Sequence, residues 1–148
     1  IIGTTWQAIR AGNEAQRADD RAADALREKT RADVTARMAL VPRTLEARGL
    51  DATPLIQRKL RAVATPDALA ACDILDLILR EEIGHVAIGN RWYRWLCQQQ
   101  GLEPVAHYKT LARLHKAPRL KGPFNTTARQ RAGFTEAELA TLAQGAEN

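Results

Sequence analysis

The sequence predicts an all-α protein with one core. Only 5% of its 148 residues are aromatic, alanine is abundant, and no run alternates polar with β-branched or aromatic residues as strands do. Helix-start signals recur: Thr53 and Thr65 each precede a proline, and Thr135 stands three residues before Glu138. These observations argue against a sandwich, a barrel or a doubly wound sheet.

The first third of the chain is polar. Residues 13–33 are almost entirely Ala, Arg, Asp, Glu and Gln, and Leu26 is their one large apolar side chain. High helix propensity without an apolar stripe predicts a solvated or frayed helix with no chemistry of its own. We therefore divide the chain into this polar segment (1–33), the core helices (34–101), and a basic loop with short C-terminal helices (102–148).

The first apolar stripe begins after this segment. Between residues 32 and 48, apolar side chains follow at steps of four, three and four: Val34, Met38, Val41 and Leu45. This spacing predicts one helical face. Pro42 is expected to kink the helix and Gly49 to end it, since proline lacks an N–H donor and glycine is typical just beyond a C-terminus.

Two further helices are expected to start at Pro54, where a short one begins, and at Pro66, where a long one runs to about Gln100. The long helix carries a stripe at alternating steps of three and four: Leu75, Ile78, Glu82, His85, Gly89, Trp92 and Leu96. Such a heptad seam faces a partner helix. Beyond Gly101 the pattern is irregular, except for a short helix opened by Asn125 and a last one from Thr135 to Gly145.

The charge is concentrated towards the C-terminus. Residues 1–33 are neutral, so the net charge of +5 belongs to the remainder, and residues 107–131 hold seven basic side chains and no acidic one: Lys109, Arg113, Lys116, Arg119, Lys121, Arg129 and Arg131. Such a segment can attract a nucleic acid, another anion or an acidic partner. The alternative is a solvated tail whose arginines pair with carboxylates of their own domain.

Two ionisable residues on the seam suggest a metal site. Glu82 and His85 form a Glu-x-x-His element, which projects both side chains from one helical face, as in di-iron and di-manganese carboxylate bundles. Carboxylate with imidazole suits iron or manganese. Glu46, next to the first stripe, is the candidate third ligand. The alternatives are that Glu82 pairs with Arg43 or Arg48, that His85 is a core histidine, and that Glu46 is a surface residue.

Three segments of the sequence resemble a known family. Residues 39–51 (ALVPRTLEARGLD), 80–95 (REEIGHVAIGNRWYRW) and 123–125 (PFN) are similar to the bacterial ferritin-like family called domain of unknown function 455, over about residues 30–142. The EEIGHVA block is the most specific part. The resemblance implies a ferritin-like four-helix bundle with a di-metal site, in which Glu46 lies on the third helix and Glu82 and His85 on the fourth.

The chain departs from that family in its first third. Two earlier helices of the family contribute another glutamate and another Glu-x-x-His, whereas Glu14 and Glu28 have no histidine three residues later. The sequence thus holds half of a site. Either the chain is a fragment or a divergent version that has lost the site, or two copies pair about a two-fold axis to give four glutamates and two histidines.

The resemblance implies a non-haem di-iron or di-manganese oxidoreductase, or oxygenase, whose substrate the sequence does not specify. The alternative is a non-catalytic helical module that binds nucleic acid or an acidic partner through its basic segment. We expect a cytoplasmic protein outside the membrane, because no apolar run reaches the roughly 20 residues of a membrane span. Cys72 and Cys97, on one helix, are too far apart to pair, which fits a reducing compartment.

Overall fold

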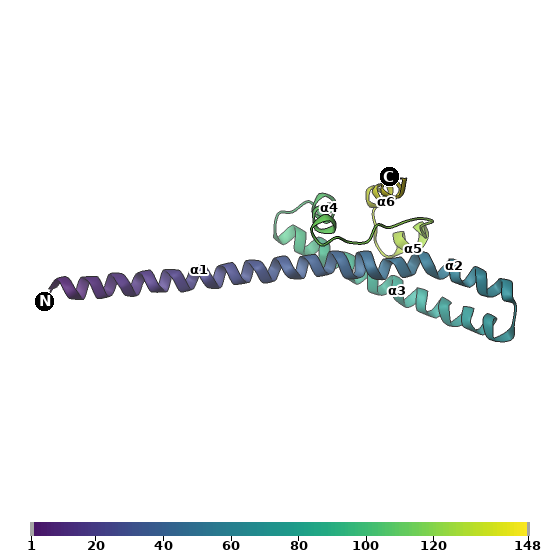
Figure 1. Ribbon diagram of the computed structural model, residues 1–148, viewed down its shortest axis with the longest axis horizontal. Coiled ribbons are helices and arrows are strands. Elements are labelled where there is room, and N and C mark those ends of the chain that lie inside the picture. The colour runs from purple at the N-terminus through teal and green to yellow at the C-terminus, as the bar shows by residue number, and fades with distance from the viewer. Residues whose placement is uncertain (1, 148) are drawn as a thin grey trace. The chain divides into compact units, whose positions relative to one another are not determined.

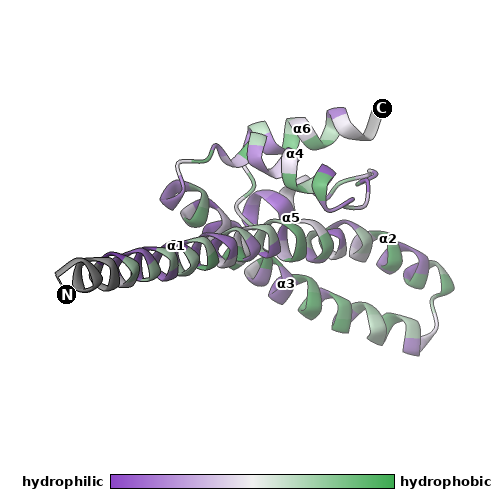
Figure 2. Ribbon diagram, turned by 60° about the vertical axis from the view of Figure 1, so that its left-hand side comes forward, coloured by the Kyte–Doolittle hydropathy of each residue, from purple (hydrophilic) through white to green (hydrophobic). Residues whose placement is uncertain are grey.

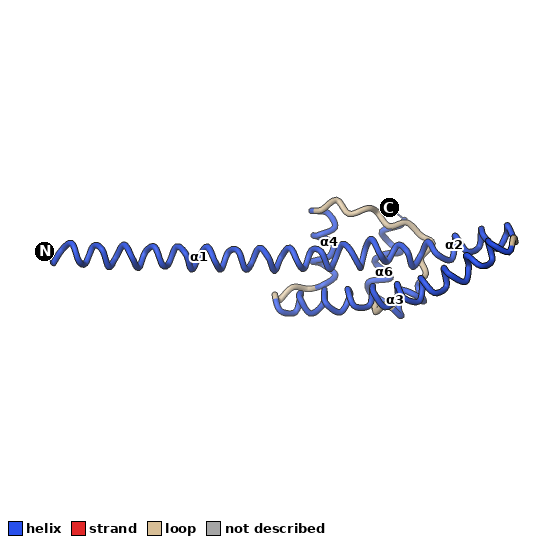
Figure 3. The backbone as a smooth tube through the Cα atoms, turned by 90° about the horizontal axis from the view of Figure 1, so that it is seen from below, coloured by secondary structure: helices blue, strands red, loops and turns tan. Residues whose placement is uncertain are grey.

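The computed structural model describes residues 2–147, with side chains from residue 10 to residue 145. This part of the chain is helical and contains no strand, so the all-α prediction is confirmed (Figure 3). Its elements are α1 (Ile2–Leu40), the π-helix η1 (Val41–Glu46), α2 (Ala47–Val63), α3 (Pro66–Gln99), α4 (Pro104–Leu114), α5 (Thr126–Arg131) and α6 (Glu136–Glu147). None of the helices described is long and apolar enough to cross a membrane.

The chain divides into two compact units, residues 1–34 and residues 35–148. The first consists of most of α1, and its described side chains are exposed, Leu26 to 65%. An ion pair joins neighbouring turns of this helix, with 2.7 Å between Arg27 Nη1 and Asp24 Oδ1. Such exposed pairs stabilise a helix by a few tenths of a kcal/mol, roughly 0.2–0.5. The predicted polar helix is therefore present.

The expected interruption at Pro42 takes the form of a π-helix. Pro42 has no N–H to donate, and in η1 its carbonyl accepts from the N–H of Ala47, five residues on. Within the same wide turn the Thr44 hydroxyl donates to the Ala39 carbonyl oxygen at 3.1 Å. The helical path therefore continues from α1 into α2 with one wide turn between them.

Two expected boundaries are wrong, since α2 runs through both Gly49 and Pro54. At Gly49 a Cβ would lie 3.9 Å from Glu82 Cγ, so this glycine sits at the contact with α3 instead of ending the helix. Pro54 cannot donate to the carbonyl of Leu50, four residues earlier. That carbonyl accepts instead from Asn125 Nδ2 at 3.1 Å. A residue distant in sequence thus compensates the bond that the proline removes.

The second unit is built on an antiparallel helix pair, in which η1 and α2 run beside α3 (Figure 1). The predicted start of α3 is confirmed, because the Thr65 hydroxyl accepts from the N–H of Ala68 at 3.3 Å. Gln57 and Cys72 join the pair near its loop: Gln57 Nε2 donates to the Cys72 carbonyl at 3.1 Å. Both cysteines are buried and free.

Three shorter helices pack on one side of this pair (Figure 1). The predicted caps of two of them are confirmed: Asn125 Oδ1 accepts from Ala128 N at 3.1 Å, and Glu138 Oε2 accepts from Thr135 N at 2.8 Å. The sequence predicts irregular structure where α4 forms, and this prediction is wrong. The Glu103 carboxylate caps it by accepting from the N–H groups of Val105 and Ala106, which lowers the pKa of Glu103.

The core forms where the short helices meet the pair. One cluster joins α2 and α3 to the segment around α5, and the second joins the end of α1 to α3 and α4; their buried members are Ala47, Leu50, Ile83, Val86, Ala128, Ala132 and Phe134, and Ala36, Ala39, Tyr93, Cys97 and Leu111. Several are alanines, so the backbones approach closely. These residues lie on the helix faces that turn towards α4, α5 and α6.

The two stripes expected to form the core are largely outside it. Val34, Val41 and Leu45 are 41–49% exposed. Of the seam on α3, Gly89 and Leu96 are buried, Leu75 and Glu82 are half-buried, and Ile78, His85 and Trp92 are exposed. The helices of the pair are apolar on two faces, and α4–α6 cover one of them. Figure 2 shows hydrophobic residues, in green, recurring along both α2 and α3.

Candidate metal-ligand face

Glu82 and His85 lie together on α3, one turn apart. His85 Nδ1 is 3.4 Å from Glu82 Oε2, a loose polar contact. The Glu82 side chain is 23% exposed because it lies against Gly49 of α2, whereas that of His85 is 63% exposed. The Glu-x-x-His element is therefore formed as the sequence predicted, on the side of α3 that the short helices leave uncovered.

Two glycine contacts fix where Glu46 lies relative to these residues. A Cβ built on Gly89 would meet Pro42, and one built on Gly49 would meet Glu82 Cγ. Both pairs have residue numbers that add to 131, as expected when two antiparallel helices pass each other with a constant register. By that register Glu46 stands level with His85. Glu46 is half-buried at the end of η1.

The donors suit iron or manganese in kind but not in number. Carboxylates with an imidazole are the ligands expected for these metals. Within the described residues, however, no group of three or more His, Cys, Asp and Glu side chains is close enough to hold a metal ion. The structure brings Glu82 and His85 together and places Glu46 at their level on the neighbouring helix without adding it to the pair. The three candidate residues therefore do not form one ligand group within the described part of a single chain.

The three candidate ligands lie among exposed apolar side chains. We call the following residues the apolar face, each of them 43–60% exposed: Val41 and Leu45 of η1, and Ile74, Ile78, Ile88, Trp92 and Trp95 of α3. The α3 members are spaced at multiples of helical turns, and His85 continues their spacing. The two indole rings lie edge to face with centroids 5.5 Å apart. An apolar face of this extent marks an interaction site.

Neither Arg43 nor Arg48, the two alternative partners for Glu82, forms an ion pair with it among the described residues. Arg43 is 3% exposed and its Nη2 donates to Glu138 Oε1 at 2.5 Å, on the side of the pair where α6 packs. Arg94 Nη2 reaches the second oxygen of the same carboxylate at 2.9 Å. Burial opposes ionisation of Glu138, but Arg43, the Thr135 N–H and Arg94 outweigh it and lower its pKa. Glu82 thus remains with His85.

Part of the basic segment has a structural role that the sequence left open. Arg129 is fully buried, and its Nε and Nη2 donate to the Asp51 carboxylate at 3.0 and 2.6 Å. This arginine therefore pairs with a carboxylate of its own domain, the second of the two alternatives. Four other basic residues of the segment line a cavity: Lys109, Arg113, Lys116 and Arg119. No local pattern in the sequence indicates this cavity, because its walls come from three separate helices and a loop.

These features define an all-helical protein in which a Glu-x-x-His element stands on an uncovered apolar face. The chain belongs to the family described as Protein of unknown function (DUF455), whose model matches residues 23–140. It is similar to an uncharacterised protein of Haemophilus influenzae, with 50% identity over 112 residues. These residues are 76% of this chain and 38% of that protein, so the chain spans well under half of its relative. No solved structure matches the chain significantly.

Proposed function

We propose that this chain supplies half of the metal site of a ferritin-like di-iron or di-manganese carboxylate protein with oxidoreductase activity. Glu46, Glu82 and His85 would hold the metal. The observation that carries the proposal is the register of the helix pair, which places Glu46 level with the Glu82–His85 element. A carboxylate on one helix facing a Glu-x-x-His element on the next is the ligand arrangement of half of such a bundle.

A second copy of the chain is the occupant that we propose for the apolar face. Two copies related by a two-fold axis would bring together two sets of Glu46, Glu82 and His85, giving four glutamates and two histidines. The same contact would bury Ile78 and Trp92, which are 48% and 49% exposed in one chain. The alternative source of the missing ligands is a segment like the part of the longer Haemophilus influenzae protein that this chain does not match.

A bound pair of such metals supplies redox chemistry towards dioxygen or a peroxide. The residues of this chain have two tasks there. Glu82 lies against Gly49 and contacts His85, which restricts both side chains before a metal arrives. The apolar face around them excludes water from the site once a second copy covers it. The exclusion of water strengthens electrostatic interactions within the site.

The first test is the metal content of protein purified under iron-replete conditions, with its oligomeric state measured by light scattering on the same sample. We expect about two metal ions per dimer, the content of a di-metal carboxylate site. Glu82→Ala and His85→Ala should each lose the metal. Glu136→Ala and His115→Ala are matched controls, because they remove the same residue types from exposed positions on α6 and after α4.

The second test separates assembly from ligation. Ile78→Glu places a charge on the apolar face and should give a metal-free monomer. Leu114→Glu should remain a metal-loaded dimer, because Leu114 is 71% exposed at the end of α4 and outside the apolar face. A metal-free protein that binds polyanions with a steep salt dependence, reduced by changes at Arg113, Lys116 or Lys121, would instead support the nucleic-acid-binding module.

A further inference from the structure

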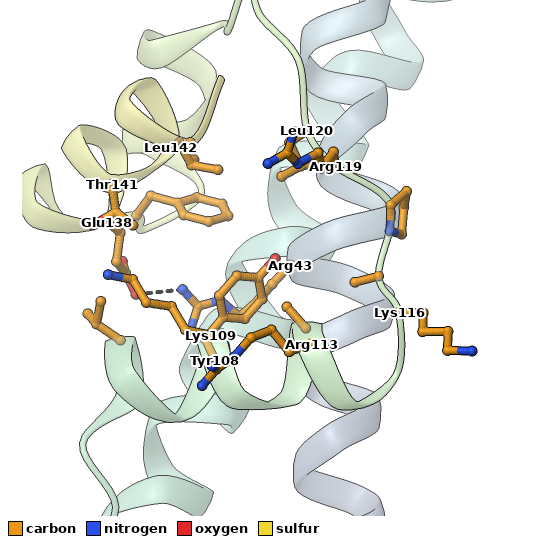
Figure 4. Close-up of a pocket in the computed structure, with 16 residues that line it drawn as sticks. Arg43, Tyr108, Lys109, Arg113, Lys116, Arg119, Leu120, Glu138, Thr141 and Leu142 are labelled. Atoms are coloured by element: carbon orange, nitrogen blue, oxygen red, sulfur yellow. Dashed lines mark hydrogen bonds and ion pairs between the residues drawn. The ribbon is translucent and has the colours of Figure 1, made fainter. Parts of the chain in front are cut away.

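A cavity of about 810 Å³ lies between α4, the segment 115–120 and α6 (Figure 4), and none of Glu46, Glu82 and His85 lines it. Much of its wall is apolar, with side chains that include Val105, Ala112, Leu120, Phe134 and Leu142. The volume falls within the range of cavities that enclose small organic ligands, about 300–1,000 Å³. The wall would therefore accommodate an apolar body.

The mouth of the cavity is basic. Lys109 and Arg113 come from α4, Lys116 follows it, and Arg119 lies on the next segment, and all four are exposed. Among the residues whose side chains the structure describes, the acidic one in the lining is Glu138. Its two oxygens are already bound by Arg43 and Arg94, and it also accepts from Thr135. The cavity consequently presents an excess of positive charge.

At the inner end the cavity reaches Arg43, which is almost completely buried. Its guanidinium carbon lies 4.5 Å from the centroid of the Tyr93 ring and 5.2 Å from that of Tyr108. Nη2 is bound to Glu138, but Nε and Nη1 are buried without a hydrogen-bond partner in the protein. Both atoms are inaccessible to solvent among the aromatic rings, which include Phe134 at 5.4 Å, so Arg43 acts on the cavity through its charge and not through a free donor. Figure 4 shows Arg43 facing the space between Tyr108 and Glu138.

We propose that this cavity binds an organic anion with an apolar body, whose charged head is held at the basic mouth by Lys109 and Arg113. Carboxylates and phosphate monoesters share this chemistry, since arginine binds both through charge-assisted hydrogen bonds. The proposal does not depend on the metal site, because Arg43 and the residues of the cavity include none of the three candidate ligands.

The test is calorimetric titration of the full chain with decanoate and with decyl phosphate, both below their micelle concentrations, and with decanol as the neutral analogue. We expect saturable binding of one anion per chain, and binding of decanol weaker by about tenfold or more because it lacks the charge-assisted hydrogen bonds. Stronger binding of one of the two anions identifies the head group.

Three variants locate the bound anion. Lys109→Gln with Arg113→Gln removes two charges at the mouth and should weaken binding by about tenfold. Lys121→Gln with Arg131→Gln removes two charges of the same basic segment outside this cavity and should change it less than about threefold. Ala112→Phe fills the cavity from α4 and should abolish binding. None of these substitutions replaces Arg43 or Glu138.

Three results would overturn the proposal. The first is that the wild-type chain binds neither anion. The second is equal weakening by the two double variants, which would mean attraction by overall charge. The third is full binding by Ala112→Phe that is folded by circular dichroism, which would place the anion on another surface, such as the apolar face.

Discussion

Gly89 of α3 and Pro42 of η1 are in such close contact that no side chain fits between them. A Cβ on Gly89 would lie 2.2 Å from both Cβ and Cγ of Pro42. The proline ring is tied to the backbone, so it cannot rotate away as a flexible side chain would. This contact sets the distance between the two helices that carry the candidate ligands, and with Gly49 it sets their register.

Gly89→Ala should therefore destabilise the protein by about 1–3 kcal/mol, the usual cost of overpacking. Gly84→Ala is the matched control on the same helix, because nothing lies within 4 Å of its added Cβ. That substitution should stabilise the protein by about 0.4–1 kcal/mol through a smaller loss of backbone entropy. Chemical denaturation measures both values. A Gly89→Ala protein as stable as the wild type would show that the helices do not approach in this way.

The pair of Arg129 and Asp51 should be required for the C-terminal segment to dock. Arg129→Ala leaves the Asp51 carboxylate without its two guanidinium donors and should lower the free energy of unfolding by about 3–5 kcal/mol. Arg129→Lys should restore little, since a lysine cannot make two parallel hydrogen bonds. The control is Arg131→Ala, an exposed position two residues later, with an expected change within about 0.5 kcal/mol.

Acid should destabilise the protein through Glu138. Its pKa is lower in the folded chain than the ordinary value of 4.5, so the stability it provides is complete above about pH 4.5. That stability is lost as the pH falls below 4.5 and through the folded pKa. Glu138→Gln should lower the free energy of unfolding at pH 7 by about 3 kcal/mol. It should also reduce the further loss of stability that the wild type shows below pH 4.5. Glu136→Gln, at an exposed position, should leave the fall in melting temperature below pH 4.5 as steep as in the wild type, measured by thermal unfolding at a series of pH values.

The proposed dimer should change the environment of Trp92 and Trp95, which are about half exposed in one chain. In a Trp6→Phe background these two indoles are the remaining tryptophans. Their emission should move to shorter wavelength, and quenching by acrylamide should decrease, as the protein concentration rises through the dissociation range. The Ile78→Glu variant should show neither change. Emission that does not depend on concentration in the parent protein would contradict the second copy as the occupant.

Sequence reasoning succeeded where the determinants are local. The caps at Thr65, Asn125 and Thr135 each use a side chain within three residues of the N–H that it accepts, so the pattern is visible in the sequence. It failed at Gly49 and Pro54, because contacts with α3 and with Asn125 decide that the helix continues. The local signal and the tertiary contacts compete at these positions, and the tertiary contacts prevail.

The candidate site divides in the same way. The Glu82–His85 element follows from spacing on one helix and was predicted. The sequence allows arginines of the basic segment to pair with carboxylates of their own domain, as Arg129 does, but it does not identify Asp51, 78 residues away. The burial of Arg43 against Glu138, 95 residues away, was not predicted. The apolar stripes predict a core position, because an apolar helix face is typical of buried surface. The pattern does not identify the element that covers the face. Both helices are apolar on two faces, and the sequence does not indicate which one α4–α6 cover.

Pro54 has a consequence for how the C-terminal segment finds its place. A helix surface repeats every turn, so hydrophobic contacts alone would permit docking at neighbouring positions shifted by three or four residues. The carbonyl of Leu50 is distinct among these positions because its helical donor is missing, and Asn125 supplies the replacement. Pro54 thus gives a repetitive helix surface one distinct attachment point. The bond from Asn125 to that point fixes where the segment beyond α4 docks along α2.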